Sequence, residues 1–394
     1  MRLAVVDEGK VLVYIPDPSQ AIASHGFEPA WLPVFYNPKM EFNRDLSVLA
    51  LQAYLDNYAP RKPIVVVEPL AATGVRALRY ALEVDGVMKV YASDIDKLAF
   101  EIMELNVGLN NAWGRVDVVN SDANALMYTL KAHGVPVLAI DIDPYGSPAP
   151  FLEAALNLVG NGGLLIVTAT DTAVLEGSRK LKAFRRYGLR LEKTPCSREV
   201  AVRALLSYIA RVAASLDKWI KPLLSLYIDY YVRLFIQVRR GAREAQRMLE
   251  ENLGYAYYYP KLGYLTIRSE VYSKLGSVEN LPLGPLWIRE IFDLGFVEMM
   301  MARLRGRYEY LRTRRRAEKL LEIIREEALV QEDVYQRVDA IASTLKTPTP
   351  SKVKIVEDLR TRGLKASLTH FHPVGVRTDA SVEELREIIK SYSS

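Results

Sequence analysis

The chain has 394 residues, 50% of them hydrophobic and 25% charged, with a formal net charge of +5 and a pI near 9.0. This length permits two domains, each with its own core. The single cysteine, Cys196, excludes an internal disulfide framework and fits a reducing cytoplasm. No apolar run reaches the roughly 18 residues of a transmembrane helix, and the N-terminus alternates like a strand without a signal peptide's features. We therefore expect a cytoplasmic protein without a membrane partner.

Positive charge is concentrated in two segments of the chain. Ser178–Lys193 holds seven Lys or Arg against one Glu, and Arg303–Lys319 holds eight against two. Such clusters can neutralise phosphates, and two of them, the second interleaved with tyrosines, favour nucleic acid as a partner. A solvated helix face is the alternative interpretation of either segment alone.

Strands alternate with helices from Ile64 to Val167. Continuous Val, Ile and Leu runs separated by helices indicate an α/β fold with a parallel, Rossmann-like sheet covered on both faces. A strand followed by a helix is expected in each of the segments 63–82, 89–110 and 116–130. A fourth strand is expected in 135–148, and a helix and a fifth strand in 151–171.

A helix over Ser197–Ile220 and long closing strands over Leu223–Gly241 are expected to complete this sheet. Gly241 is the expected boundary, with residues 1–240 forming the first domain, including an N-terminal segment that contacts substrate. Residues 241–394 are expected to form an α+β C-terminal domain. It would contain a Tyr-rich strand region, a helical segment, a Pro-rich break and a short amphipathic helix: Leu253–Tyr272, Phe292–Leu329, Thr347–Ser351 and Lys352–Gly363.

Ligands of an open parallel sheet bind beyond the carboxyl ends of its strands. Glu68 ends the first strand and precedes a small-residue turn and a helix that starts near Gly74. This turn lacks the G-x-G-x-x-G pattern that binds the pyrophosphate of a dinucleotide, so it is poorly suited to a dinucleotide cofactor. A plain tight turn explains this stretch equally well.

The second and third strand ends carry further acids. Asp94 lies twenty residues after Gly74, where an acid can accept hydrogen bonds from ribose hydroxyls, whereas Asp96 is expected to cap the next helix. Asp122 and the Ala123 backbone can hold an adenine amino group and ring edge, although Asp122 as a helix cap is equally plausible. A ribose and adenine site without a phosphate clamp favours S-adenosylmethionine over NAD.

The fourth strand end has the most distinctive chemistry, with Asp143, Pro144 and Tyr145 in succession. An exocyclic amine on a nucleobase is a poor nucleophile because its lone pair is delocalised into the ring. The Asp143 carboxylate and the Pro144 carbonyl oxygen can each accept an amine hydrogen and so aim the lone pair, while Tyr145 stacks on the base. The alternative is a strand-end turn with Tyr145 in the core. Asp141 is assigned no chemistry.

Motifs throughout the chain resemble one family of RNA-modifying enzymes. From about Val34 to Ala380, seven motifs occur in the order typical of the archaeal tRNA (guanine(26)-N2)-dimethyltransferase family. The resemblance implies a class I methyltransferase sheet and transfer of methyl groups from S-adenosylmethionine to guanine N2 in tRNA, once and then again. The motifs are VFYNPKMEFNRDLS, AATGVRALRY, SDID, SDAN, DIDPYGSP, GPLW and THFHPVGVRTDA.

The resemblance also implies roles for individual residues. Asp143 would orient the guanine amine and accept its proton, and Phe35 and Tyr145 would sandwich the flipped base. The residues alone favour a core position for Phe35. A guanidinium fork suits the methionine carboxylate of the cofactor. The cofactor contacts would be Arg44 and Arg76 at the methionine end, Asp94 at the ribose, and Asp122 and Ala123 at the adenine.

One departure from the family concerns metal. Many relatives carry four cysteines in the region corresponding to Leu253–Tyr272, but this stretch has no Cys or His. We therefore expect no zinc, with tyrosine packing in its place. We interpret Cys196 as a buried or helix-capping thiol, and His370 and His372 as part of a structural turn.

Three other functions remain open at this stage. The first is an amino methyltransferase acting on adenine N6 or on a protein glutamine. The second is a NAD-dependent oxidoreductase, which the absent glycine pattern disfavours. The third is a tRNA-binding protein without catalysis. No obligate protein partner is evident, and tRNA is the expected partner.

Overall fold

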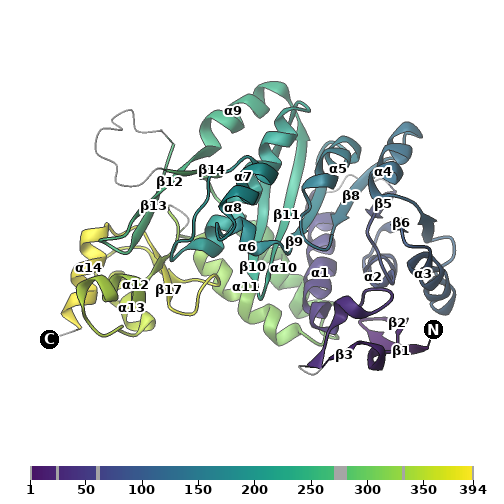
Figure 1. The fold of residues 1–394 in the computed structure, drawn as a ribbon, viewed down its shortest axis with the longest axis horizontal. Coiled ribbons are helices and arrows are strands. Elements are labelled where there is room, and N and C mark those ends of the chain that lie inside the picture. Colours follow the sequence, from purple (N-terminus) through teal and green to yellow (C-terminus); the bar gives the residue numbers. More distant parts are fainter. Residues whose placement is uncertain (1, 24–25, 59–62, 270–281, 331–332, 393–394) are drawn as a thin grey trace. The chain divides into compact units, whose positions relative to one another are not determined.

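The protein is described by a computed structural model that covers residues 2–392 apart from 24–25, 59–62, 270–281 and 331–332 (Figure 1). Its internal contacts divide the chain into two compact units. The first comprises residues 1–167, 237–239 and 299–318, and the second 168–236, 240–298 and 319–394. The domain boundary after residue 240 stays a prediction, because compactness within the whole chain does not test which segments fold alone.

A seven-stranded sheet has the order β10-β11-β9-β8-β5-β6-β7. The pairs β5–β6, β5–β8, β6–β7 and β8–β9 are parallel, and the later strands β10 and β11 close the sheet at one side. The α/β, Rossmann-like prediction is confirmed. The strands are β5 Ile64–Glu68, β6 Val87–Asp94, β7 Val116–Asn120, β8 Val137–Ile142, β9 Gly163–Ala169, β10 Lys218–Ile228 and β11 Tyr231–Arg240.

Helices follow the first strands as the alternating pattern predicts. Every residue of β5, β8 and β9 is buried, which explains their nearly continuous apolar sequences. One helix follows each of the strands β5 to β8 along the chain: α2 Val75–Glu83, α3 Lys97–Leu109, α4 Ala123–Ala132 and α5 Leu152–Leu158. The parallel strands therefore bring Glu68, Asp94 and Asp143 to one edge of the sheet.

The rest of the first unit is built around an N-terminal hairpin and a long helix. The hairpin pairs β1 Leu3–Glu8 with β2 Val11–Pro16, and α1 spans Glu41–Tyr58. Gly9, at φ +61°, turns the hairpin where a Cβ would collide with the side chains of Arg79 and Glu83. Short elements connect these parts: η1 Pro18–Ala21, β3 Ile22–Ala23, β4 Gly26–Phe27, η2 Pro29–Trp31, η3 Pro38–Met40 and η4 Ala149–Phe151.

The second unit contains two small sheets. The Tyr-rich region forms β12 Leu253–Tyr259 and β13 Tyr264–Arg268, which join β14 Leu283–Trp287 in the order β13-β12-β14. The last sheet has the order β15-β17-β16, from Gln336–Arg337, Gly375–Thr378 and Ala366–Leu368. The first four helices of this unit are α6 Thr172–Leu175, α7 Lys180–Tyr187, α8 Ser197–Ala214 and α9 Ala242–Asn252.

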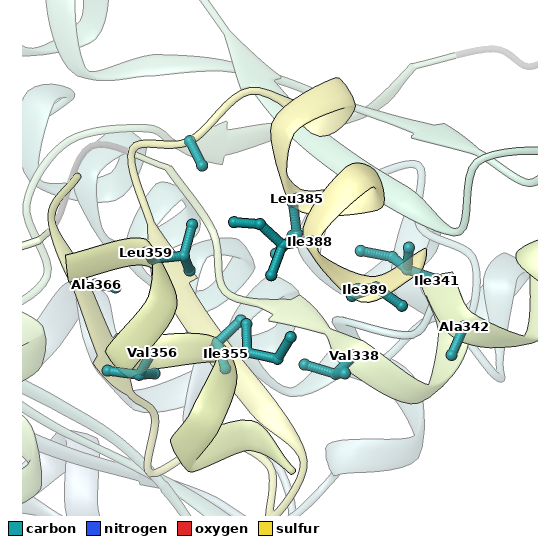
Figure 2. Packing of buried hydrophobic residues seen from close by; sticks show 12 residues of the cluster. Val338, Ile341, Ala342, Ile355, Val356, Leu359, Ala366, Leu385, Ile388 and Ile389 are labelled. Carbon is teal, nitrogen blue, oxygen red and sulfur yellow. The ribbon is translucent and has the colours of Figure 1, made fainter. Parts of the chain in front are cut away.

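Helices near the C-terminus agree with the predicted pattern. The region expected to be helical holds α10 Leu294–Gly306 and α11 Arg314–Ala328, two helices whose residues the contacts divide between the units. The terminal helices α12 Val338–Leu345, α13 Lys352–Thr361 and α14 Val382–Ser391 bury a common apolar cluster (Figure 2). No described helix is long and apolar enough to cross a membrane.

Cys196 and His370 have structural surroundings in the second unit. Cys196 is buried, and its Sγ donates to the Tyr335 carbonyl oxygen; burial raises the pKa of the thiol far above its usual range. The His370 Nδ1 atom lies 2.5 Å from Glu327 Oε2 inside the protein, and His372 is half-buried. Neither the thiol nor the His370 ring is presented to a ligand, as the structural interpretations expected.

Candidate active site

The turn after β8 presents three chemically distinct groups. The Asp143 side chain is 17% exposed, Pro144 is buried, and Tyr145 is 82% exposed. The alternative of a core tyrosine at this turn is therefore wrong. A carboxylate partly open to solvent thus stands beside a ring that is almost fully available for stacking.

The Arg76 guanidinium lies at the centre of a buried acidic cluster. Its Nε is 3.2 Å from Glu68 Oε1, its Nη1 is 3.2 Å from Asp141 Oδ2, and its Nη2 pairs with Asp143 Oδ2. Arg76 sits in the first turn of α2, where the chain leaves the carboxyl end of β5 and faces the end of β8. One cation therefore holds three carboxylates from two adjacent strand ends.

Polar groups on α1 and α2 complete the support of this cluster. Arg76 Nη1 donates to Asn43 Oδ1 at 2.8 Å and to Ser47 Oγ at 3.0 Å. Tyr80, one helical turn after Arg76, donates its hydroxyl to Asp141 Oδ2 at 2.6 Å. Asp141 is fully buried and holds its neighbours in place, which agrees with assigning it no chemistry.

Glu68 is the acid whose protonation the cluster alters most clearly. Burial raises its pKa, the Arg76 guanidinium opposes this, and the charges of Asp141 and Asp143 raise it further, to about 8. Three carboxylates share one guanidinium, which leaves two negative charges unbalanced, so a neutral Glu68 relieves part of the repulsion. Glu68 is therefore mostly protonated at pH 7, and the Arg76 guanidinium then faces two carboxylates in place of three.

Phe35 and Tyr145 form the aromatic part of the site. Their ring centroids are 6.2 Å apart with an interplanar angle of 75°, an edge-to-face contact. Phe35 is 39% exposed, so its core interpretation is wrong. The structure brings together the two rings named as a base sandwich, although a flat base between them needs the rings to turn parallel and separate.

Asp94 organises the loop between β5 and α2. Its Oδ2 accepts a hydrogen bond from the Ala72 amide at 3.0 Å, and its Oδ1 accepts one from the Asp96 amide at 3.0 Å. Ala72 has a φ of +48°, an uncommon conformation for a residue with a Cβ. Asp96 caps α3 by accepting from the Leu98 amide, so its predicted capping role is confirmed.

Asp122 is the N-cap of α4. Its Oδ1 accepts from the Asn124 amide at 2.9 Å and from the Ala125 amide at 3.0 Å, and Ala123 next to it is buried. The capping role is therefore real, while the adenine contact of Asp122 and Ala123 stays a prediction. The Asp94 carbonyl accepts from the Ser121 amide at 3.2 Å, which joins the ends of β6 and β7.

Arg44 is buried and engaged by an acid that the sequence interpretation did not assign. Its Nε donates to Glu8 Oε1 at 2.6 Å and its Nη2 donates to Glu8 Oε2 at 2.5 Å. Glu8 also accepts from Arg79 Nη1 at 3.0 Å and from the Tyr36 hydroxyl at 3.0 Å. Burial alone would raise the pKa of Glu8, but Arg44 and Arg79 outweigh it and lower the pKa to about 2. A cofactor carboxylate at Arg44 would therefore share this guanidinium with Glu8.

Two of the supporting residues had a recognisable signal in the sequence and one did not. Tyr80 lies four residues after Arg76, a spacing that places both on one face of a helix. Glu68 ends a wholly apolar strand, where an acid is unusual. Glu8 belongs to a strand with ordinary alternation, so only the folded hairpin reveals its role.

The region in which many relatives bind zinc corresponds to the Tyr-rich sheet of the second unit. Within the described ranges, no group of three or more His, Cys, Asp or Glu side chains is arranged to hold a metal ion. Residues 270–272 at the end of the predicted region lie outside the described residues. Tyr257 is buried on β12, and β12 pairs with β13 through Tyr258 and Leu265. Tyrosine packing in place of zinc stays a prediction.

Comparisons with known proteins agree over nearly the whole length of the chain. The family model for N2,N2-dimethylguanosine tRNA methyltransferase matches residues 11–390. A tRNA (guanine(26)-N(2))-dimethyltransferase of Aeropyrum pernix is 44% identical, with 100% of this chain and 98% of the relative covered. A protein of the same name from Saccharolobus solfataricus is 38% identical, with 99% of this chain and 100% of the relative covered.

A solved structure is similar in both sequence and fold. Trm1 from Pyrococcus horikoshii, in complex with S-adenosyl-L-methionine, superposes with a TM-score of 0.84 at 34% identity. The match covers 98% of this chain and 99% of the other. The site geometry, the family model and full-length relatives lead to one conclusion. The chain belongs to the family of N2,N2-dimethylguanosine tRNA methyltransferases.

Proposed function

We propose that this protein transfers methyl groups from S-adenosylmethionine to the exocyclic N2 amine of guanosine 26 in tRNA. The products are N2-methylguanosine and then N2,N2-dimethylguanosine. The observation that carries the proposal is the turn after β8, where Arg76 holds the Asp143 carboxylate beside the exposed Tyr145 ring. The names of the full-length relatives support the same reaction and position.

Polar groups beside Arg76 fit the methionine part of this cofactor. Glu68 Oε2 and Asn43 Nδ2 are buried and have no hydrogen-bond partner among the described residues. A carboxyl oxygen can accept from an ammonium group, and an amide nitrogen can donate to a carboxylate. Arg76 contacts both Glu68 and Asn43, and these residues with Arg44 would hold the amino acid end, while Asp94 would hold the ribose and Asp122 and Ala123 the adenine. The cofactor supplies the electrophile, a methyl group on positively charged sulfur.

The residues of the chain prepare the nucleophile. Asp143 and the Pro144 carbonyl oxygen accept the two amine hydrogens and aim the lone pair, since proline restricts the backbone direction. Arg76 holds the Asp143 carboxylate in place, and this carboxylate can accept a proton once the amine has gained a methyl group and become acidic. Asp143, which is partly exposed, then releases this proton to solvent. One amine hydrogen remains after the first transfer, and Asp143 accepts it in the second. Phe35 and Tyr145 hold the flipped base flat.

Nucleoside mass spectrometry of a tRNA transcript tests the proposal. After incubation with the protein and S-adenosylmethionine, we expect N2-methylguanosine to appear first and N2,N2-dimethylguanosine to replace it. A transcript with adenosine at position 26 should lose both signals. N6-methyladenosine in place of these products would favour another amino methyltransferase. A lack of S-adenosylmethionine binding in calorimetry would contradict the proposal and restore the oxidoreductase alternative.

Substitution of Tyr145 is expected to affect tRNA methylation more than cofactor binding. Stacking of a base on an aromatic ring contributes about 1–3 kcal/mol, so Tyr145→Ala should lower kcat/KM for tRNA by about tenfold or more. Tyr145→Phe keeps the ring and is the matched control, with a change of less than about threefold expected. Equal losses in both variants would assign the effect to the hydroxyl and contradict the stacking role.

The proposal also includes the segment that binds tRNA and the compartment in which the protein acts. Residues 241–394 would form a tRNA-binding domain, and the protein would act in the cytoplasm, where unmodified tRNA is available. The net charge of +5 supports a polyanionic partner.

A further inference from the structure

The short helix α7 exposes apolar side chains within a basic segment. Leu181 is 87% exposed and Phe184 is 68% exposed. These two residues and Arg185 share one face of the helix by their spacing of three and four residues. The helix packs through its other face, where Ala183 and Tyr187 are buried. Leu181 and Phe184 are therefore large apolar side chains that do not pack in the core.

The opposite face of α7 shows that the helix is firmly placed. The Tyr187 hydroxyl donates to Asp171 Oδ2 at 2.9 Å, and Arg186 Nη1 lies 2.8 Å from the same oxygen. Gly188, in the left-handed conformation at φ +63°, ends the helix, and its amide donates to the Phe184 carbonyl oxygen. The exposed face is thus a rigid surface that a partner can contact without ordering the chain first.

Most of the charge on α7 and its flanks is not neutralised by the protein. Within the described ranges, Lys180 pairs with Glu192, the single acid of the segment, and Arg186 pairs with Asp171. The exposed side chains of Arg179, Lys182, Arg185 and Lys193 form no ion pair with described residues. Unneutralised cations around exposed apolar groups suit a partner that has both negative charge and flat apolar faces.

The second basic segment differs in this respect. Five of its arginines pair with acids of the first unit: Arg303 with Asp56, Arg305 with Glu318, Arg307 with Asp85, Arg312 with Asp7, and Arg314 with Glu309. In addition, the Arg316 guanidinium lies 4.1 Å from the centre of the Phe42 ring. Much of its charge is therefore used within the protein, and the two segments are not equivalent as RNA contacts.

We propose that α7 is a tRNA-contacting surface, in which Lys182, Arg185 and the flanking Arg179 bind phosphates and Phe184 stacks on an unpaired base. This inference rests on the proposed function and adds the surface on which the substrate lies. Along the chain, α6 and α7 are the next two helices after β9. RNA is favoured over a membrane or an apolar protein partner because the face is small and surrounded by cations.

Binding of a radiolabelled tRNA transcript at several salt concentrations tests the proposal. Loss of two phosphate contacts in Lys182→Gln/Arg185→Gln should reduce the slope of log Kd against log salt by about 2 and weaken binding about tenfold or more near 0.1 M salt. Phe184→Ala should weaken binding about fivefold or more with an unchanged slope, because stacking displaces no counterions. The double variant Lys97→Gln/Lys131→Gln removes two exposed charges that lie outside both α7 and residues 241–394, and it should change neither quantity much.

The outcomes separate this inference from the proposed function. If the wild-type protein methylates tRNA and the α7 variants bind it as tightly as wild type, α7 is not the contact surface and the function stands. If the wild-type protein does not methylate tRNA, the function itself fails. Binding of α7 to anionic vesicles, lost in Phe184→Ala while tRNA affinity stays unchanged, would replace RNA with a membrane surface. Calorimetry with S-adenosylmethionine should give the same affinity for every α7 variant.

Discussion

An Asp143→Asn variant is expected to lose methyl transfer to tRNA by a factor of about 10²–10⁴ in kcat, the range typical of a positioned acid–base group. The amide keeps the size of the side chain but accepts a proton poorly and can turn its NH₂ toward the amine that needs an acceptor. The initial rate of N2-methylguanosine formation, measured with saturating tRNA and cofactor, gives this loss directly.

Binding measurements distinguish catalysis from folding in this variant. The affinity for S-adenosylmethionine should change by less than about threefold, because Arg76 keeps Glu68 and Asp141 as partners. Asp117→Asn is the matched control, since Asp117 is half-exposed on β7 and pairs with Lys89 at 2.6 Å. Full methyl transfer by Asp143→Asn would support the view that the protein binds tRNA without catalysing its methylation.

An Arg76→Met variant is expected to have the largest effect on stability. Removal of the guanidinium leaves Glu68, Asp141 and Asp143 close together without a cation, and breaking a buried ion pair costs about 3–5 kcal/mol. The free energy of unfolding in urea at pH 7 measures the loss. The loss should shrink as the pH falls from 7 to 5. Without the cation the three carboxyl groups repel one another in the folded state, and protonation at lower pH relieves this repulsion.

Two further substitutions test the electrostatic explanation of that loss. Arg76→Met/Asp141→Asn removes one of the unpaired charges and should recover part of the stability. Arg247→Met removes an arginine that is mostly exposed on α9 and should cost less than about 1 kcal/mol. If the double variant is less stable than Arg76→Met alone, repulsion among the carboxylates is not the cause.

The sheet was predictable because strands that are buried on both faces have nearly continuous apolar sequences. The strands β5, β8 and β9 are apolar along nearly their whole length, and the helices between them require parallel pairing. The acids at the strand ends follow from the same argument, since parallel strands place their carboxyl ends on one edge. Asp94 and Asp143 could therefore be named before the structure was known.

The partners of the charged side chains were not predictable in the same way. Arg44 pairs with Glu8, 36 positions away, and Arg307 pairs with Asp85, 222 positions away. Neither distance corresponds to a helix or strand period, so no local pattern records it. A run of arginines consequently resembles an RNA contact even where the folded chain supplies acids to most of them. Exposure and pairing in three dimensions distinguish α7 from the Arg303–Lys319 segment.

The hydrogen bond from the Ala72 amide to Asp94 has a consequence for which adenosine compounds the protein admits. A loop that binds phosphate offers its amides to an anion, whereas here the amide is already satisfied by a carboxylate. ATP and the dinucleotides share adenine and ribose with S-adenosylmethionine, but they also carry phosphates, which need free amide donors of this kind. A sulfonium compound brings positive charge to the same edge of the sheet. The loop therefore has one free donor fewer for a phosphate, and we expect the protein to bind S-adenosylmethionine more tightly than ATP or a dinucleotide.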